Sequence, residues 1–207
     1  MTAKEFWNDF ENYEQNLRFY LDSLPNVKDH SAFNHICAQL DSYCPGLEAI
    51  LTSRSKEKDD CHTLVISCNG DKDLFLYINR LVDEAPKILE WDIKAFIQPK
   101  FKEGSEIWDT PYTFDSFSIT PKDIFFTVIA WDHEKNIFDI LFLLPLNLSD
   151  VDNDKLEQAF FVILQELWGE RFVADRIHSL SFIDHINSKF DFVEFELLQE
   201  CLESFKE

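Results

Sequence analysis

The sequence predicts an α+β fold: a mixed, mainly antiparallel β-sheet packed against helices, with an N-terminal helical hairpin. Residues 4–22 and 31–43 carry apolar side chains every three or four positions, which is the spacing of one face of a helix. After Gly46 the apolar period shifts toward two, as in strands. Hydrophobic residues make up 45% and charged residues 28% of the chain, which is typical of a folded protein and not of a disordered one.

The length of 207 residues fits one domain that can bury its own core without a metal ion or disulfide bridges. We therefore expect a single α+β domain over residues 1–207, with the helical hairpin over 1–44 and the sheet with its packed helices over 45–207. The chain has 21 Phe but only 4 Gly, so the predicted core is rich in aromatic rings.

The first strands follow the helical hairpin. Residues 47–53 and 62–68 alternate apolar side chains and predict a strand pair with a charged connection. Asp71 is the expected N-cap of a helix that runs to about Val82. Residues 91–98 predict the next strand, and the length of this strand, helix and strand is consistent with one crossover connection.

The middle of the chain predicts a loop and then a hairpin. Residues 99–123 are polar and rich in proline and form a long loop, in which 113–119 is the candidate for a short strand. Two apolar runs, 123–131 and 136–144, flank the polar segment DHEK and predict a β-hairpin. Because both runs are almost continuously apolar, we expect the hairpin to lie centrally and to be covered on both faces.

A further long helix is expected to begin at Asp150 or Asp152, whose carboxylates would accept the free amide hydrogens of its first turn. Gly169 is expected to end this helix in a left-handed conformation, which glycine adopts at little cost. Residues 172–184 then predict a strand, and residues 192–205 predict a C-terminal helix.

The chain is strongly acidic, with a formal net charge of −20. Lys and Arg form no cluster beyond the mixed segment RSKEK at 54–58, so we expect no nucleic-acid partner. Anionic membrane surfaces are disfavoured for the same reason. Such acidity suits a basic protein partner, or it serves only to keep the protein in solution.

The sequence predicts a cytoplasmic protein. Its first fifteen residues carry acids and aromatics where a signal peptide has a basic start and an apolar run. The longest apolar stretch, 137–148, is interrupted by Asp139, Pro145 and Asn147 and is too short to cross a bilayer. The five cysteines are odd in number and lack paired short spacings, which fits reduced thiols.

The candidates for proton-transfer chemistry lie where the helix over 150–168 gives way to a strand. Glu166 and Glu170 would form an acid–base pair if one helical face carried both. Asp175 and His178 follow, and together the four would line a polar pocket at this junction. The alternative is that the helix ends between the two glutamates, which keeps them apart and leaves Glu170 in solvent.

Other kinds of site lack their patterns. The six histidines show neither HExxH nor Cys-x-x-Cys spacing, so we predict no metal. Segment 67–73 has one glycine and two acids where a phosphate-binding loop needs space, so we predict no cofactor. Cys61 beside His62 has no context that would lower the pKa of a thiol, and no Gly-x-Ser-x-Gly elbow is present. We assign no catalytic residue outside the four candidates.

Residues 64–100 resemble a family of uncharacterised bacterial proteins. In that family a strand ends in Ser-x-x-Gly, a helix carries Leu-Phe and then Leu-Val-x-x-Ala-Pro, and Trp with Ala-Phe follows on the next strand. The matching residues here are Ser67, Gly70, Leu74, Phe75, Leu81, Val82, Ala85, Pro86, Trp91, Ala95 and Phe96. Segment 166–177, ELWGERFVADRI, is similar to a later part of the family pattern, while a basic residue expected after Ala-Phe is displaced to Lys100. The resemblance implies a cytoplasmic α+β protein and assigns no activity.

Two functions remain open. The first is a non-catalytic interaction protein whose acidic face binds a basic protein, as a toxin antagonist or a regulatory adaptor would. The second is an enzyme or binding protein for a small molecule, with a pocket near Glu166, Glu170, Asp175 or His178. A deep apolar pocket with converging polar groups would favour the second, and a broad acidic surface the first.

Overall fold

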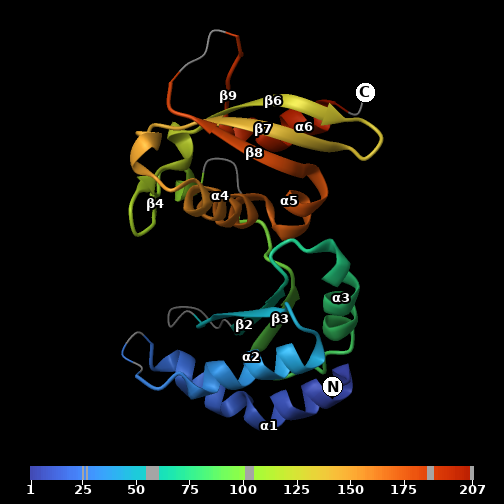
Figure 1. The fold of residues 1–207 in the computed structure, drawn as a ribbon. Coiled ribbons are helices and arrows are strands. Elements are labelled where there is room, and N and C mark those ends of the chain that lie inside the picture. The colour runs from blue at the N-terminus through green and yellow to red at the C-terminus, as the bar shows by residue number, and fades with distance from the viewer. Residues whose placement is uncertain (25, 27, 55–60, 101–104, 186–188, 206–207) are drawn as a thin grey trace. The chain divides into compact units, whose positions relative to one another are not determined.

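The structure, a computed structural model, describes residues 1–24, 26, 28–54, 61–100, 105–185 and 189–205. It has the predicted α+β fold with an N-terminal pair of helices (Figure 1). The chain divides into two compact units, residues 1–97 and 98–207, and each contains its own cluster of buried side chains. The helices predicted over 1–44 share a core with the first three strands. The single domain expected over 1–207 stays a prediction.

The N-terminal unit packs three helices on a three-stranded sheet. Its elements are α1 (Ala3–Asp22), α2 (Ser31–Tyr43), β1 (Glu48–Thr52), β2 (His62–Ser67), η1 (Lys72–Leu74), α3 (Phe75–Asp83) and β3 (Trp91–Ala95). β1 pairs antiparallel with β2, and β2 pairs parallel with β3, in the order β1-β2-β3. The predicted strand pair and the crossover are thus confirmed, while residues 55–60 of the predicted charged connection lie outside the described residues.

Local hydrogen bonds explain where these helices begin. The N–H of Glu5 donates to Thr2 Oγ1 (3.2 Å), and the N–H of Thr2 donates to Glu5 Oε2 (2.7 Å), which forms a capping box at the start of α1. α2 begins at Ser31, whose N–H donates to Asp29 Oδ1 (2.9 Å). Asp71 accepts a backbone hydrogen bond at the start of η1, as predicted.

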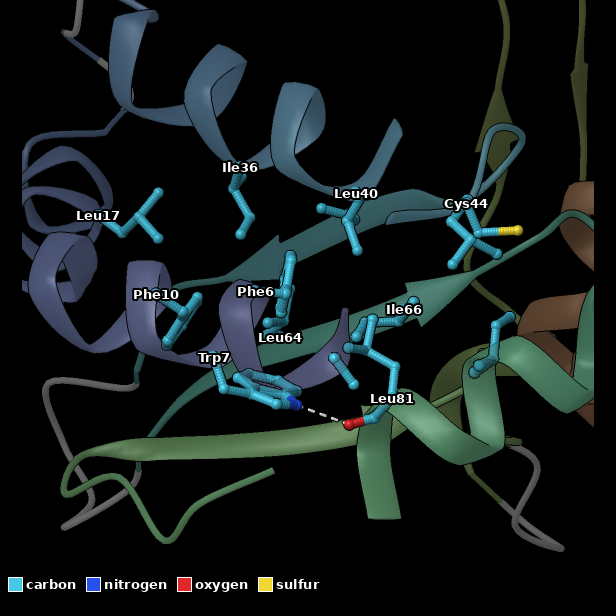
Figure 2. Close-up of a cluster of buried hydrophobic side chains, with 14 of the residues drawn as sticks. Phe6, Trp7, Phe10, Leu17, Ile36, Leu40, Cys44, Leu64, Ile66 and Leu81 are labelled. Atoms are coloured by element: carbon cyan, nitrogen blue, oxygen red, sulfur yellow. Dashed lines mark hydrogen bonds between the residues drawn. The ribbon is translucent and has the colours of Figure 1, made fainter. Parts of the chain in front are cut away.

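The core of the N-terminal unit lies between its helices and its sheet (Figure 2). Phe6, Phe10 and Leu17 lie on one face of α1 and are almost completely buried, as the spacing of three and four predicts. Trp7 Nε1–H donates to the carbonyl oxygen of Leu81 (2.7 Å; Figure 2). This buried hydrogen bond joins α1 to the last turn of α3.

The C-terminal unit contains a four-stranded sheet and a separate small hairpin. Its elements are η2 (Glu106–Trp108), β4 (Tyr112–Thr113), β5 (Ser118–Ile119), η3 (Pro121–Asp123), β6 (Phe125–Asp132), β7 (Ile137–Leu143), η4 (Leu148–Asp150), α4 (Asn153–Trp168), α5 (Glu170–Arg176), β8 (Ile177–Ile183), β9 (Val193–Glu194), η5 (Phe195–Leu197) and α6 (Leu198–Ser204). The larger sheet has the order β8-β7-β6-β9, and among the described strands β4 pairs only with β5. The described strands are thus divided among three sheets, whereas we expected one.

The predicted hairpin of β6 and β7 is confirmed, and both strands lie inside the larger sheet. The expectation that both are covered on both faces is wrong for β6. β7 is largely buried, but β6 is exposed from Ile129 to Asp132. None of the described helices has both the length and the apolar character needed to span a bilayer.

Two other predictions are corrected near the C-terminus. α4 begins after its N-cap Asp152, as predicted, but the strand predicted over 172–184 begins only at Ile177. The preceding residues form α5, because Gly169 (φ 86°, ψ 147°) redirects the chain and its carbonyl accepts the N–H of Val173 (3.2 Å) to start a new helix. In the helix predicted over 192–205, the first turn is replaced by β9, which pairs with β6.

Candidate functional site

Strand β6 presents apolar side chains to solvent. Phe125, Ile129 and Trp131 are 37%, 43% and 40% exposed, although each lies in the four-stranded sheet. Single exposed apolar residues are ordinary, whereas large contiguous apolar patches mark interaction sites. We define the β6 surface as the exposed side chains of Phe125–Asp132. Its apolar side chains do not share one face of the sheet, because Phe125 pairs with Leu143 whereas Trp131, beyond the bulge, pairs with Phe138 and packs against the Phe138 and Phe205 rings.

The sheet changes register beside this surface. The pairing of β6 with β7 shifts between Val128 and Ala130, and the pairing of β7 with β8 shifts next to Asp139. Such bulges redirect side chains and are common near functional sites. Here they allow two neighbouring residues of β8 to reach one carboxylate: His178 Nδ1 lies 3.1 Å and Ser179 Oγ lies 2.7 Å from Asp139 Oδ1.

A hollow of about 280 Å³ lies at the C-terminal end of β6. Its lining includes Trp131, Asp132 and Lys135 together with Asp139 and His178. A carboxylate only accepts hydrogen bonds, so Asp139 requires the proton on His178 Nδ1 and leaves a lone pair on Nε2 of the neutral ring. The hollow therefore offers two carboxylates, an ammonium group, an indole ring and an oriented imidazole.

A second hollow of about 250 Å³ lies at the other end of β6. Phe125 and Trp108 supply aromatic surface, and the carboxylates of Glu194 and Glu196 border it beside Lys122. Lys122 is already ion-paired with a carboxylate outside this hollow. Aromatic rings and carboxylates thus occur together at both ends of the β6 surface.

The β6 surface belongs to the more acidic half of the chain. Residues 98–207 contain 22 acidic and 9 basic side chains, a net charge of −13, whereas residues 1–97 contain 17 and 10, a net charge of −7. Between positions 190 and 205 there is no Lys or Arg. The exposed acids of that segment are Asp191, Glu194, Glu196, Glu200 and Glu203.

The two predicted glutamates occupy different environments. Glu166, near the end of α4, accepts a hydrogen bond from the Tyr112 hydroxyl (3.2 Å) and pairs with Lys100 Nζ (3.2 Å). Burial and the Glu166 carboxylate raise the pKa of Tyr112 far above its usual value, so the phenol keeps its proton. Glu170, predicted to lie in solvent if the helix ended before it, is instead completely buried as the first residue of α5.

The four predicted site residues are not gathered into one pocket. Glu166 lines a hollow of about 350 Å³ with Lys100 and Tyr112, whereas His178 lines the hollow beside Asp139. Asp175 is exposed on α5. Sequence reasoning missed Asp139 as a site residue, although a single charged residue inside the apolar run 136–144 was a signal that could have identified it.

A separate polar cluster surrounds His62 in the N-terminal unit. The ring is completely buried, Nδ1 accepts the N–H of Arg54 (3.3 Å), and Nε2 lies 3.7 Å from Asp22 Oδ1. Among the described residues Nε2 has no hydrogen-bond partner. Burial lowers the pKa of His62, and the nearby Asp22 carboxylate only partly opposes this effect. The ring is therefore neutral at pH 7.

Ion pairs connect the surroundings of His62 to α1. Arg54 Nη1 donates to Glu90 Oε2 (2.6 Å), and Arg18 pairs with both Glu90 (3.5 Å) and Glu14 (2.6 Å). Trp91 Nε1–H also donates to Glu14 Oε2 (3.1 Å). The His62 imidazole is sealed from solvent, and the ion pairs around it hold α1 against the sheet.

No three or more His, Cys, Asp or Glu side chains converge to hold a metal ion in the described part of the chain. Comparisons with models of known protein families, with curated proteins and with solved structures found no match. The resemblance of residues 64–100 to a bacterial family thus stays a prediction.

Proposed function

We propose that this protein is a non-catalytic interaction module that binds a basic segment of a protein partner on the β6 surface. The observation that carries the proposal is an exposed apolar strand with carboxylates at both ends, in a unit of net charge −13. Apolar side chains at the centre with charged groups around them are the usual arrangement of a protein interface.

The two kinds of side chain have different roles in this proposal. Burial of exposed apolar side chains of β6, Ile129 above all, under a partner supplies affinity at roughly 25 cal/mol per Å² of apolar area, before the cost of association. The acidic field accelerates encounter with a basic partner and rejects acidic ones. A toxin antagonist and a regulatory adaptor would both use such a surface. The five cysteines are unbridged, which supports a cytoplasmic location.

The test is an affinity pulldown with three matched proteins. Ile129→Lys adds a positive charge in the middle of the β6 surface, and Val162→Lys adds the same charge at a 47% exposed position on α4. At low salt we expect the wild type and Val162→Lys to recover the same basic protein and Ile129→Lys to lose it. At about 1 M salt, where the Debye length is about 3 Å, recovery by all three should fall. Recovery of no basic protein, or equal recovery by Ile129→Lys, would contradict the proposal.

A second candidate function is supported by one observation, the pairing of His178 with Asp139 beside an open hollow. An imidazole oriented by a carboxylate can act as a general base toward a small molecule. His185 is a matched control, because it is also exposed and paired with an aspartate (2.8 Å), but outside this hollow. In a thermal-shift screen of small molecules, a ligand of the hollow should stabilise the wild type and His185→Ala but not His178→Ala. A screen in which no compound separates the two variants would remove this candidate.

A further inference from the structure

The open edge of β6 deepens the proposed function. On one side of β6, β7 pairs with it from Phe125 to Asp132. On the other side, β9 pairs with β6 at Phe125 and Phe126 alone. On that side, residues 127–132 therefore face no strand within the described part of the C-terminal unit (Figure 1). The N–H and C=O groups on a strand edge can pair with another extended chain.

The chain itself pairs with one end of this edge of β6. The N–H of Phe195 donates to the carbonyl oxygen of Ile124 (3.2 Å), and β9 continues the ladder for two residues. The two strands are antiparallel, so the residues that would continue this ladder along 127–130 precede Val193. The residues at 189–192 form no strand, while β6 continues for six more residues. At about 3.3 Å per residue, the open part of the edge is about 20 Å long.

This edge lacks most of the features that prevent strand pairing. Proteins protect edges with Lys, Pro, bulges or covering segments. β6 reads FFTVIAWD, so it has neither Lys nor Pro. Among the described residues its protection consists of the bulge near Ile129, the charge of Asp132 and the Phe205 ring that packs on Trp131. An accessible edge with exposed Ile129 and Trp131 is the type of surface to which partners add a strand.

The charges around the edge favour a basic partner segment. Asp132 lies at one end, and Glu194 and Glu196 border the hollow at the other. A second copy of this chain would bring the same carboxylates together, and like charges opposite each other are destabilising. A segment that alternates apolar residues with Lys or Arg would place cations near these carboxylates, and Trp131 adds an aromatic face for one of them.

We propose that the partner segment is an extended, basic stretch of about six residues that adds to the open edge of β6 as an additional β-strand. This inference rests on the proposed function and specifies its binding mode. Main-chain hydrogen bonds to residues 127–132 supply affinity, and alternate side chains give specificity.

The experiment uses a synthetic peptide of alternating Lys and Val, Lys-Val-Lys-Val-Lys-Val-Lys-Val, with both ends capped. Its control has the same sequence with a methyl group on every backbone nitrogen, which keeps the charge but removes the hydrogen-bond donors of both edges. We expect the first peptide to bind the full-length protein at low salt and the methylated peptide to bind at least about tenfold more weakly. Ile129→Lys should bind neither peptide, whereas Val162→Lys should behave as the wild type.

Amide hydrogen exchange provides the decisive readout. On addition of the Lys-Val peptide, amides within 127–132 should exchange more slowly, while those of α1 should not change. If both peptides bind equally and these amides are not protected, strand addition is wrong while binding of a basic segment stands. If neither peptide binds at low salt, both proposals fail. If the protein alone self-associates with protection of 127–132, the occupant is a second copy, which overturns the inference.

Discussion

At the residue scale, burial decides what His62 can do. Its ring is sealed from water, and Nε2 lies 3.7 Å from an Asp22 oxygen, so the charged form loses hydration and gains only a loose ion pair. The pKa of His62 is therefore lower in the folded chain than in the unfolded chain. Below about pH 6.5, His62 binds a proton in the unfolded chain more readily than in the folded chain, so the free energy of unfolding falls as the pH falls.

We predict that His62→Gln weakens this pH dependence. Between pH 7.5 and 5.5 the wild type should lose more free energy of unfolding than His62→Gln, as measured by urea denaturation. The pKa of Glu14 is lowered from a usual value that already lies below this window, so that carboxylate does not contribute. His133→Gln, an exposed substitution, should follow the wild type. A His62 pKa above 6.5 in an NMR titration would contradict this account.

Trp7 donates a hydrogen bond to the Leu81 carbonyl, to which the N–H of Ala85 does not bond. At the end of α3 the N–H of Ala85 bonds to Val82 rather than to Leu81, so the Leu81 oxygen takes its hydrogen bond from Trp7 Nε1. Trp7→Phe removes the donor from a buried pair and should cost about 1–3 kcal/mol of unfolding free energy. Phe19→Leu, on the exposed side of α1, should change it by less than about 0.5 kcal/mol. Equal effects of the two substitutions in urea denaturation would show that this hydrogen bond is unimportant.

Contacts between distant residues are what the sequence could not predict. His178 was a predicted site residue, but its partner Asp139 is 39 positions away and becomes a neighbour only through the register of β7 and β8. Asp22, at the end of α1, reaches His62 through the packing of α1 on the sheet, with α2 and β1 between them in the chain. Spacing along the chain predicts neighbours within one helix or strand, and it carries no information on pairing between strands.

At the element scale, long periodic segments were predicted well. α1 and α2 were predicted from their apolar spacing, α4 from its start signal, and the β6–β7 hairpin from two apolar runs around a polar turn. Short elements were predicted less accurately. β4 and β5 have two residues each, a single period of the alternation, and they lie at the two ends of the one short strand predicted over 113–119. α5 was read as a strand because Phe172 and Val173 favour strands locally and Gly169 was expected only to end a helix.

Gly169 joins two helices in a conformation that other residues seldom adopt. Its φ of 86° and ψ of 147° lie close to a region populated almost only by glycine. We predict that Gly169→Ala costs about 1–3 kcal/mol of unfolding free energy. Gln158→Ala, on the exposed face of α4, should change it by less than about 0.5 kcal/mol. Denaturant unfolding of the two variants checks this, and a neutral Gly169→Ala would mean that the junction readily adopts another backbone geometry.

At the scale of the whole molecule, the acidity is unevenly distributed. The net charge of −13 in residues 98–207 against −7 in residues 1–97 places most of the field on the unit that carries the β6 surface. The sequence showed the total charge but not this correspondence, because the exposed strand was expected to be covered. The N-terminal unit has an ordered core and an ion-pair cluster but no comparable exposed strand among its described residues.

The division of the core predicts that each unit folds alone. Leu64 and Phe142 are fully buried, the first in the cluster of the N-terminal unit and the second in that of the C-terminal unit. Fragments 1–97 and 98–207 should therefore each unfold cooperatively by circular dichroism, since about 100 residues are enough for a stable core. Leu64→Ala should destabilise only the first fragment, by about 2–5 kcal/mol, and Phe142→Ala only the second, by about 3–5 kcal/mol. If neither fragment folds, the chain is one cooperative domain, as the sequence led us to expect. If both fold, the Lys-Val peptide should bind fragment 98–207 as tightly as the full chain, because the residues proposed to hold it all belong to that unit.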